Sequence, residues 1–138
     1  MSSRPAVVVA GLIALTLGAA GARGADGPDP REVNRAIDLG VDFLKRQQRA
    51  DDGSWQYQSN HVVGMSALAG LALLESGVDR DDPAIRKVER GIRASVVDEP
   101  QTYDLTLAIL FLSRVQPEIP GPNDDVIRRI ARRLAGGG

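Results

Sequence analysis

The chain of 138 residues lacks cysteine, has a single histidine and is poor in aromatic side chains. Without cysteine it can form no disulfide, offers no thiolate to a metal ion and has no thiol nucleophile. With only one histidine besides, a zinc site built from cysteine and histidine is not expected, and no cofactor is predicted. Aromatic residues make up 4% of the chain and hydrophobic residues 43%. The core is therefore expected to consist of Leu, Ile, Val and Ala, which suits helix-on-helix packing.

An excess of charge of one sign is also lacking. The sequence has 17 basic and 18 acidic residues, a formal net charge of −1. Such a balance creates no field of one sign that would attract nucleic acid or an anionic membrane, so neither is predicted as a partner. The length is sufficient for one domain at most.

The N-terminal residues carry the pattern of an export signal. Arg4 precedes an apolar run over residues 6–20, and Ala20-Gly21-Ala22 supplies the small-x-small pattern that signal peptidase accepts. The sequence therefore predicts a signal peptide at residues 1–22 and export to the periplasm or the extracellular space. The alternative is an uncleaved N-terminal anchor, although the run is short and rich in Gly and Ala for a membrane span. No membrane span is expected after cleavage.

Helical patterns follow the export signal. Residues 23–30, rich in Gly, Pro and Asp, have no periodicity and are expected to form a linker. Beyond them, apolar residues recur at spacings of three and four. Five helices are predicted, at residues 31–49, 61–76, 83–95 and 102–115 and from Asn123 or Asp124 onward.

The predicted helices alternate in character. The first, third and fifth have one apolar stripe, which in the first includes Val33, Ile37 and Val41. The second and fourth are apolar nearly all round, and residues 70–74 match residues 108–112 in character as a weak internal repeat. This alternation is typical of two helical layers, in which outer helices show one face to water and inner helices are covered on both sides. A generic helix bundle is the alternative.

A spaced motif lies at the end of the first predicted helix. It reads Gly40-x-x-Phe43-Leu44-x-x-x-Gln48-x-x-x-x-Gly53-x-Trp55. This spacing resembles the QW repeat of squalene and oxidosqualene cyclases, which protein prenyltransferase β subunits show in weaker form. Leu39 stands where the family has a basic residue before the glycine. The resemblance implies an all-α fold, the α/α toroid, in which helical hairpins form two concentric rings around a cavity.

The signature residues of the motif have structural roles in their own right. Gln48 is expected in the last turn of its helix, where its amide can satisfy end carbonyls. Gly53 permits a turn conformation that other residues avoid. Trp55 is expected to pack against the neighbouring repeat with its indole N–H satisfied, as a structural residue and not as part of a substrate site.

Later copies of the motif are incomplete. Arg90-Gly91 is similar to its opening, but Asp98-Glu99-Pro100 replaces the turn. Arg133-Leu134 matches Phe43-Leu44, and the chain ends where a third signature would begin. Residues 31–138 are therefore predicted to form about five helices of a partial ring. An open arc leaves a flank uncovered, so self-association, or contact with the remaining toroid repeats, is expected there.

Three residues at the starts of the apolar helices are candidates for chemistry. The resemblance places the N-termini of inner helices at the toroid cavity, and Asp104, after Tyr103, lies in the first turn of the fourth helix. A carboxylate there would act as an acid or bind a cationic or hydroxylated ligand. The alternative is that Asp104 caps local N–H groups. His61 starts the second helix, and for it a capping or hydrogen-bonded role is the alternative to a ligand role.

An acidic cluster precedes the third helix. Asp79-Arg80-Asp81-Asp82 has the letters of the D-x-D-D acid motif of class II terpene cyclases, in which a carboxylic acid donates a proton. The cluster follows an apolar helix, however, and Pro83 comes next. A solvated turn with Asp82 as the helix N-cap explains it.

These observations leave three functional hypotheses. The first is an exported terpenoid cyclase/prenyltransferase-like toroid protein that is a non-catalytic scaffold or a truncated fragment of a longer toroid. The alternative is part of an isoprenoid cyclase or transferase whose catalytic half is missing from this chain. A sugar-active enzyme on an α/α barrel would need paired carboxylates, and only Asp104 is well placed. Missing catalytic motifs favour a non-catalytic role but leave open whether the chain is an enzyme.

Overall fold

The computed structural model describes residues 27–55, 60–116 and 118–136. The predicted signal peptide at residues 1–22 and half of the predicted linker lie outside these ranges. Within them the chain is all helical, with five helices and no strand, as predicted. None of these helices is long and apolar enough to cross a membrane. The helices are α1 (Pro30–Gln47), α2 (Val62–Glu75), α3 (Pro83–Ser95), α4 (Thr102–Val115) and α5 (Asp124–Gly136).

The ends of the helices agree with the sequence prediction to within two residues. α3 and α4 have the predicted bounds. α1 begins at Pro30, one residue earlier than predicted, because the Asp29 side chain caps it by accepting a hydrogen bond of 2.9 Å from the Arg31 amide. It ends at Gln47, since Gln48 already has extended backbone angles (φ −66°, ψ 129°).

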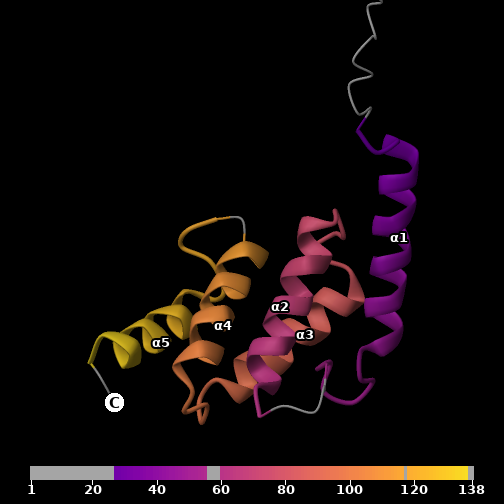
Figure 1. Cartoon of the computed structure of the whole chain (residues 1–138). Helices are drawn as coiled ribbons and strands as arrows, with labels where there is room; N and C mark the ends of the chain where they lie inside the picture. The colour runs from indigo at the N-terminus through magenta and orange to yellow at the C-terminus, as the bar shows by residue number, and fades with distance from the viewer. Residues whose placement is uncertain (1–26, 56–59, 117, 137–138) are drawn as a thin grey trace, which may run out of the picture.

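α2 and α4 lie side by side at the centre of the molecule (Figure 1). α3 packs on α2 and also contacts α4, whereas α5 packs on α4. Aliphatic side chains and one phenylalanine fill the space between these four helices. The largest of those that are at most 2% exposed are Leu73, Ile85, Val88, Ile92, Phe111, Leu112 and Ile130.

The internal repeat in the sequence is matched by the burial of its residues. Along residues 70–74 the side chains are buried, half-buried, exposed, buried and buried, and residues 108–112 follow the same order. α2 and α4 therefore hold the same register towards the core. They also approach closely, since a Cβ on Gly70 would lie 2.5 Å from the Phe111 ring.

One face of the two central helices is open. Leu68 of α2 is 46% exposed, and Tyr103 and Leu110 of α4 are 54% and 53% exposed. The expectation that inner helices are covered on both sides is therefore wrong for this face. Tyr103 and Leu110 are seven residues apart and so share one side of α4; together with Leu68 these exposed side chains are called here the open row.

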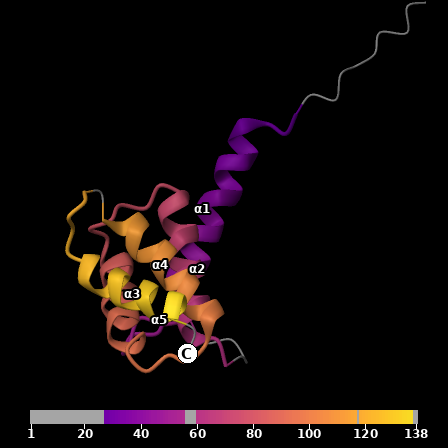
Figure 2. The same ribbon diagram turned by 90° about the vertical axis from the view of Figure 1, so that its left-hand side faces the viewer.

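α1 projects from the rest of the molecule (Figures 1 and 2). None of its residues is buried, and Val33 and Ile37 of its apolar stripe are 38% and 41% exposed. Its C-terminal part packs on the core through Val41 and Leu44. The expected burial of the stripe is therefore wrong for the first half of α1, which extends past the end of α2.

Candidate functional site

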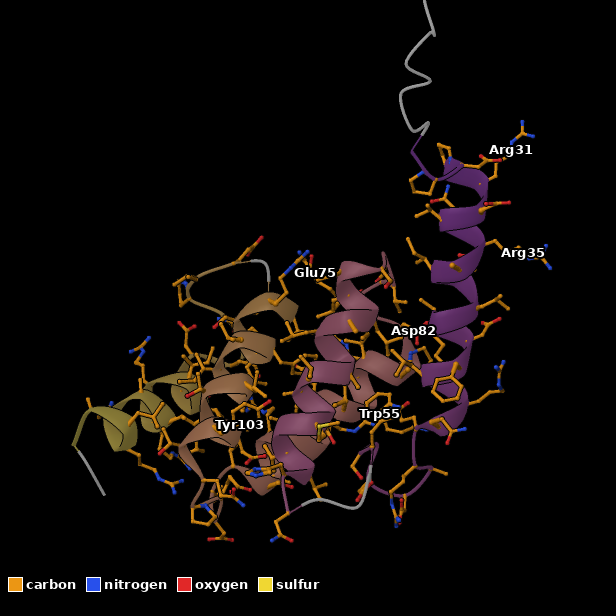
Figure 3. All side chains as sticks on the ribbon, in the orientation of Figure 1. Arg31, Arg35, Trp55, Glu75, Asp82 and Tyr103 are labelled. Atoms are coloured by element: carbon orange, nitrogen blue, oxygen red, sulfur yellow. The ribbon has the colours of Figure 1, made fainter. Side chains whose placement is uncertain are left out.

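The three candidate residues at the starts of α2 and α4 lie next to one another. Asp104 is fully buried, and its Oδ2 lies 2.6 Å from Nδ1 of His61. The rings of His61 and Tyr103 meet edge to face, with centroids 5.4 Å apart. Tyr103, in the first turn of α4, is itself exposed (Figure 3). The packing of α4 on α2 thus brings together the residues that the sequence singles out.

Asp104 caps α2, although α4 carries it. Its Oδ1 accepts a hydrogen bond of 2.5 Å from the amide of Gly64, in the first turn of α2. His61 occupies the N-cap position of α2 without making a capping bond from its own side chain, so the carboxylate from α4 takes this role. The expectation of a local cap is corrected accordingly, because the capped amide belongs to the neighbouring helix. A side chain in place of Gly64 would obstruct this contact, since its Cβ would lie 2.7 Å from Oδ1.

The ring of His61 is oriented by Asp104. When Asp104 is ionised it can only accept hydrogen bonds, so Nδ1 is assigned the proton and Nε2 is the acceptor of the neutral ring. The imidazole is 41% exposed. A histidine oriented by a carboxylate can take a proton from a nucleophile or a substrate, provided that this third group comes within hydrogen-bond reach.

The turn after α1 is tied to α3 by the side-chain amide of Gln48. Its Nε2 donates to the carbonyl of Gly53 at 3.0 Å and to that of Ala84, in the first turn of α3, at 2.9 Å. Gly53 has φ +75°, and a Cβ there would lie 2.8 Å from the backbone carbon of Lys87. The turn conformation predicted for Gly53 is confirmed. The expectation for Gln48 needs a correction, because the carbonyls that it satisfies belong to the turn and to α3, not to the end of α1.

Trp55 is buried between the end of α1 and α2. It is 8% exposed, its indole N–H donates to the Leu44 carbonyl at 2.8 Å, and its amide donates to the Ser66 hydroxyl at 3.1 Å. One side of its ring borders an apolar groove of about 350 Å³ between α1 and α2. Phe43, at 55% exposure, and Leu68 of the open row also line this groove. The predicted burial of Trp55 and the satisfaction of its N–H are confirmed.

The acidic turn at residues 79–82 caps α3. Asp82 Oδ1 accepts from the Ala84 amide at 2.8 Å, and its Oδ2 pairs with Lys45 Nζ at 2.6 Å. The hydrogen bond from Lys45 holds the pKa of Asp82 below its usual value, and the Ala84 amide adds to this effect. Asp81 is 78% exposed. These contacts confirm the predicted N-cap, and the letters of the acid motif lie in a surface turn.

A buried polar cluster that the sequence did not predict joins α3, α4 and α5. Asn123 is fully buried; its side-chain amide donates to Glu89 Oε1 at 2.8 Å, and its backbone amide donates to Gln116 Oε1 at 2.8 Å. Its Oδ1 accepts a hydrogen bond from Arg93. One signal of this cluster is in the sequence, since Glu89 lies on the same face of α3 as the apolar stripe. Because its polar groups are paired with one another, the cluster holds the three helices together.

A second groove, of about 490 Å³, lies between the start of α3 and the end of α4. Two of its arginines are paired with acids, Arg86 with Glu89 at 3.0 Å and Arg114 with Glu75 at 2.6 Å. This mixed charge does not favour anions. Among the residues that the structure describes, no group of three or more His, Cys, Asp and Glu side chains is placed to hold a metal ion.

Comparison with known proteins finds no matching family model, no matching curated protein and no matching solved structure.

Proposed function

We propose that this chain is an exported, non-catalytic repeat module of the α/α-toroid type, whose α1 flank is the joint to further repeats or to a second copy. The exposed apolar face of α1 carries this proposal. The motif from Gly40 to Trp55 supports the toroid type, because its spacing resembles that of the QW repeat.

The two copies of the motif opening support the joint at α1. The turn after α1 lies close to Gly91 of α3, where a Cβ would be 2.5 Å from the carbonyl oxygen of Asp52. At Gly40 of α1, a Cβ would meet no atom within 4 Å. The residues three positions earlier differ in the same way, since Val88 is 1% exposed and Ile37 is 41% exposed. α1 therefore offers the kind of surface that a neighbouring repeat covers in α3.

The contacts of the candidate acid favour a structural role. Both oxygens of Asp104 are engaged, Oδ1 by the Gly64 amide and Oδ2 by His61. A carboxylate that caps one helix from another stabilises their packing without any substrate.

Sedimentation velocity of the purified protein over a range of concentrations tests the joint. We expect the apparent mass to rise with concentration, because exposed apolar helix faces drive association. Ile37→Glu should abolish this rise. Leu39→Glu is the matched control, since Leu39 is 58% exposed and two residues along a helix point to nearly opposite sides. A monomer at every concentration, with one cooperative melting transition, would count against the joint.

The export part of the proposal is tested at the N-terminus. Mass spectrometry of the protein recovered from a secreting host should show a chain that begins at residue 23, because cleavage is expected after the Ala20-Gly21-Ala22 pattern. Recovery of the uncleaved chain in the membrane fraction would support the anchor instead.

The open row favours a second candidate function. Leu68, Tyr103 and Leu110 would line the inside of a closed ring, and apolar walls are what an isoprenoid substrate needs. The chain would then be part of an isoprenoid cyclase or transferase whose catalytic half is missing here. Further Gln-x-x-x-x-Gly-x-Trp repeats in a continuing reading frame after Gly138 would favour this candidate over the scaffold.

A further inference from the structure

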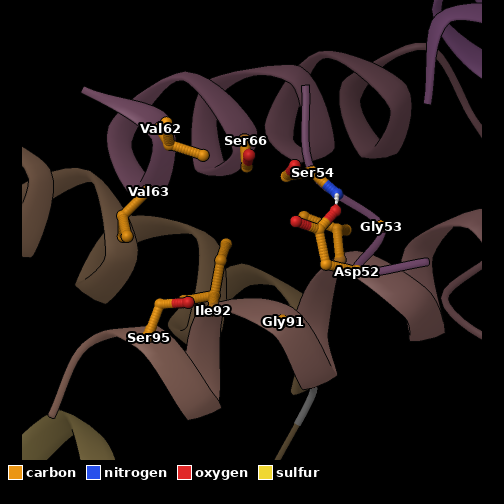
Figure 4. A pocket seen from close by; sticks show the side chains of 10 residues that line it. Asp52, Gly53, Ser54, Val62, Val63, Ser66, Gly91, Ile92 and Ser95 are labelled. Carbon is orange, nitrogen blue, oxygen red and sulfur yellow. Dashed lines mark hydrogen bonds between the residues drawn. The ribbon is translucent and has the colours of Figure 1, made fainter. Parts of the chain in front are cut away.

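The apolar stripe of α1 is uncovered, whereas that of α3 is covered. The turn after α1 closes over the α3 stripe, so that Asp52 lies against Gly91 and the neighbouring Ile92 is 2% exposed (Figure 4). On α1 the stripe faces water, since Val33 and Ile37 are 38% and 41% exposed. An amphipathic helix normally buries such a face against another segment.

The uncovered stripe is continuous with the apolar groove between α1 and α2. Ile37 and Leu44 are seven residues apart and so share one side of α1. Leu44 also lines the groove, together with Phe43 and Leu68, which are 55% and 46% exposed. Apart from Gln47, the side chains that line the groove are hydrophobic. α1 therefore offers one apolar surface along most of its length.

The apolar run at residues 6–20 is close enough in the chain to reach this surface. It contains no charged residue. Residues 21–29 can span about 30 Å when extended, whereas α1 rises only about 21 Å from Pro30 to Leu44. The run can therefore fold back over any part of the stripe. Contact between the two apolar surfaces removes area from water on both of them.

Linkage within one chain favours this contact over contact with a second copy. A segment held by a short linker has an effective concentration in the millimolar range, about a thousand times that of a protein at micromolar concentration. The stripe is thus filled by the apolar run of its own chain for as long as that run remains attached.

We propose that residues 6–20 cover the apolar stripe of α1 in the precursor, the chain that retains residues 1–22, and that cleavage on export uncovers it. This inference rests on the proposed function, since it concerns the same flank of α1 and the same cleavage after Ala22. It gives the run a second role besides export. The α1 joint becomes available to another repeat or another copy only after cleavage, which prevents premature association.

Engineered disulfides test the contact, because the chain has no cysteine of its own. The precursor is made by cell-free synthesis without signal peptidase, at nanomolar concentration, where contacts between chains are negligible. Ile37→Cys is combined in turn with Val8→Cys, Leu12→Cys and Leu15→Cys, and Leu39→Cys replaces Ile37→Cys in the control, since Leu39 points to nearly the opposite side of α1. The best pair with Ile37→Cys should close at least about fivefold faster than its control, because the cover raises the local concentration. Equal rates at the two α1 positions for all three pairs would overturn the proposal.

Amide hydrogen exchange compares the precursor with the chain that begins at residue 23. Residues 31–40 should exchange about tenfold or more slowly in the precursor, because α1 can unfold locally only after the cover has left. Leu12→Glu in the precursor should restore the faster exchange, while exchange in α4 stays unchanged. Equal exchange in the two chains would overturn the cover, and so would protection of the precursor that rises with protein concentration, which would indicate a second copy. Failure of the proposed joint gives a different result, in which the chain from residue 23 stays monomeric in sedimentation while the precursor remains protected.

Discussion

At Asp104, burial and hydrogen bonding act against each other. Full burial disfavours a charged carboxylate, while the Gly64 amide and the His61 ring compensate for the lost water. Asp104→Ala leaves the Gly64 amide without this acceptor, so we expect the free energy of unfolding to fall by roughly 2–4 kcal/mol. Asp104→Asn keeps an acceptor for Gly64 and should lose less. Urea denaturation followed by circular dichroism measures both.

A double-mutant cycle with His61→Ala separates the pair from the cap. Because His61 and Asp104 are in contact, their losses should be non-additive by about 0.5–3 kcal/mol. Additive losses would show that the two side chains do not interact in solution.

Gly40 and Gly91 form a matched pair of helical glycines. A methyl group on Gly40 meets no neighbour, so Gly40→Ala should raise the free energy of unfolding of the monomer by about 0.5–1 kcal/mol through better helix propensity. A methyl group on Gly91 collides with the Asp52 carbonyl, so Gly91→Ala should lower it by about 1–3 kcal/mol. Thermal melting at low protein concentration gives both signs. A loss at Gly40 would mean that another molecule covers α1.

Trp55 combines a large buried ring with one buried polar bond. Trp55→Ala should cost roughly 3–5 kcal/mol, as expected for a buried aromatic side chain. Trp55→Phe retains most of the ring but loses the bond to the Leu44 carbonyl, and about 1 kcal/mol is expected beyond the change in packing. Phe43→Ala, at 55% exposure, is the control and should cost much less than Trp55→Ala. A cost below about 1 kcal/mol for Trp55→Ala would show that the indole is exposed.

Asp82 makes the contact between α1 and the start of α3 depend on pH. Its folded-state pKa lies below the usual 3.8, chiefly because of Lys45, so its contribution is complete above that value and is lost as the pH falls through the lower, folded-state pKa. Asp82→Asn keeps an N-cap acceptor but removes the charge. The variant should therefore lose stability at pH 7 and lose less of it on acidification than the parent does. Parallel stability curves between pH 6 and pH 2 would contradict a role for this pair.

Among the helices, the pattern of the sequence predicted existence and type well. The bounds of α3 follow from Asp82 and Pro83, which cap and start it, and those of α2 and α4 follow from long apolar runs. That the first half of the α1 stripe is exposed was not predictable, because periodicity shows that one face is apolar but not whether a partner covers it. The exposed open row has the same explanation, since its residues are as apolar as those of the core.

The candidate site was predictable in its residues but not in its contacts. The positions of His61 and Asp104 at helix starts indicated capping, yet only the packing of α4 on α2 decides that Asp104 caps the neighbouring helix. The Asn123 cluster depends on three helices meeting, and no local pattern contains that information. Gln48 likewise reaches Ala84, a residue 36 positions away.

The whole molecule should show a gradient of stability along the chain. α2 and α4 are contacted from several sides, whereas residues 31–40 of α1 are all exposed. Amide hydrogen exchange measured by mass spectrometry should therefore be fast for residues 31–40 and slowest in α2 and α4. If a second copy covers α1, protection of residues 31–40 should rise with protein concentration while that of α4 stays constant. Uniform protection throughout the chain would contradict this gradient.

The close contact between Gly91 and the Asp52 carbonyl bears on how such repeats diverge. The matching position in the last helix is Ile130, three residues before Arg133, and the turn that faces that helix has lost the Gln-Gly-Trp signature. There Arg133 holds the turn through the carbonyls of Val96 and Glu99, so a long side chain replaces close backbone contact. In α3 a glycine and a close turn thus occur together, whereas in α5 a long side chain at the turn accompanies an isoleucine at the matching position. Under the proposed repeat organisation, the open space at Gly40 would admit the turn of a neighbouring repeat as closely as Gly91 admits Asp52.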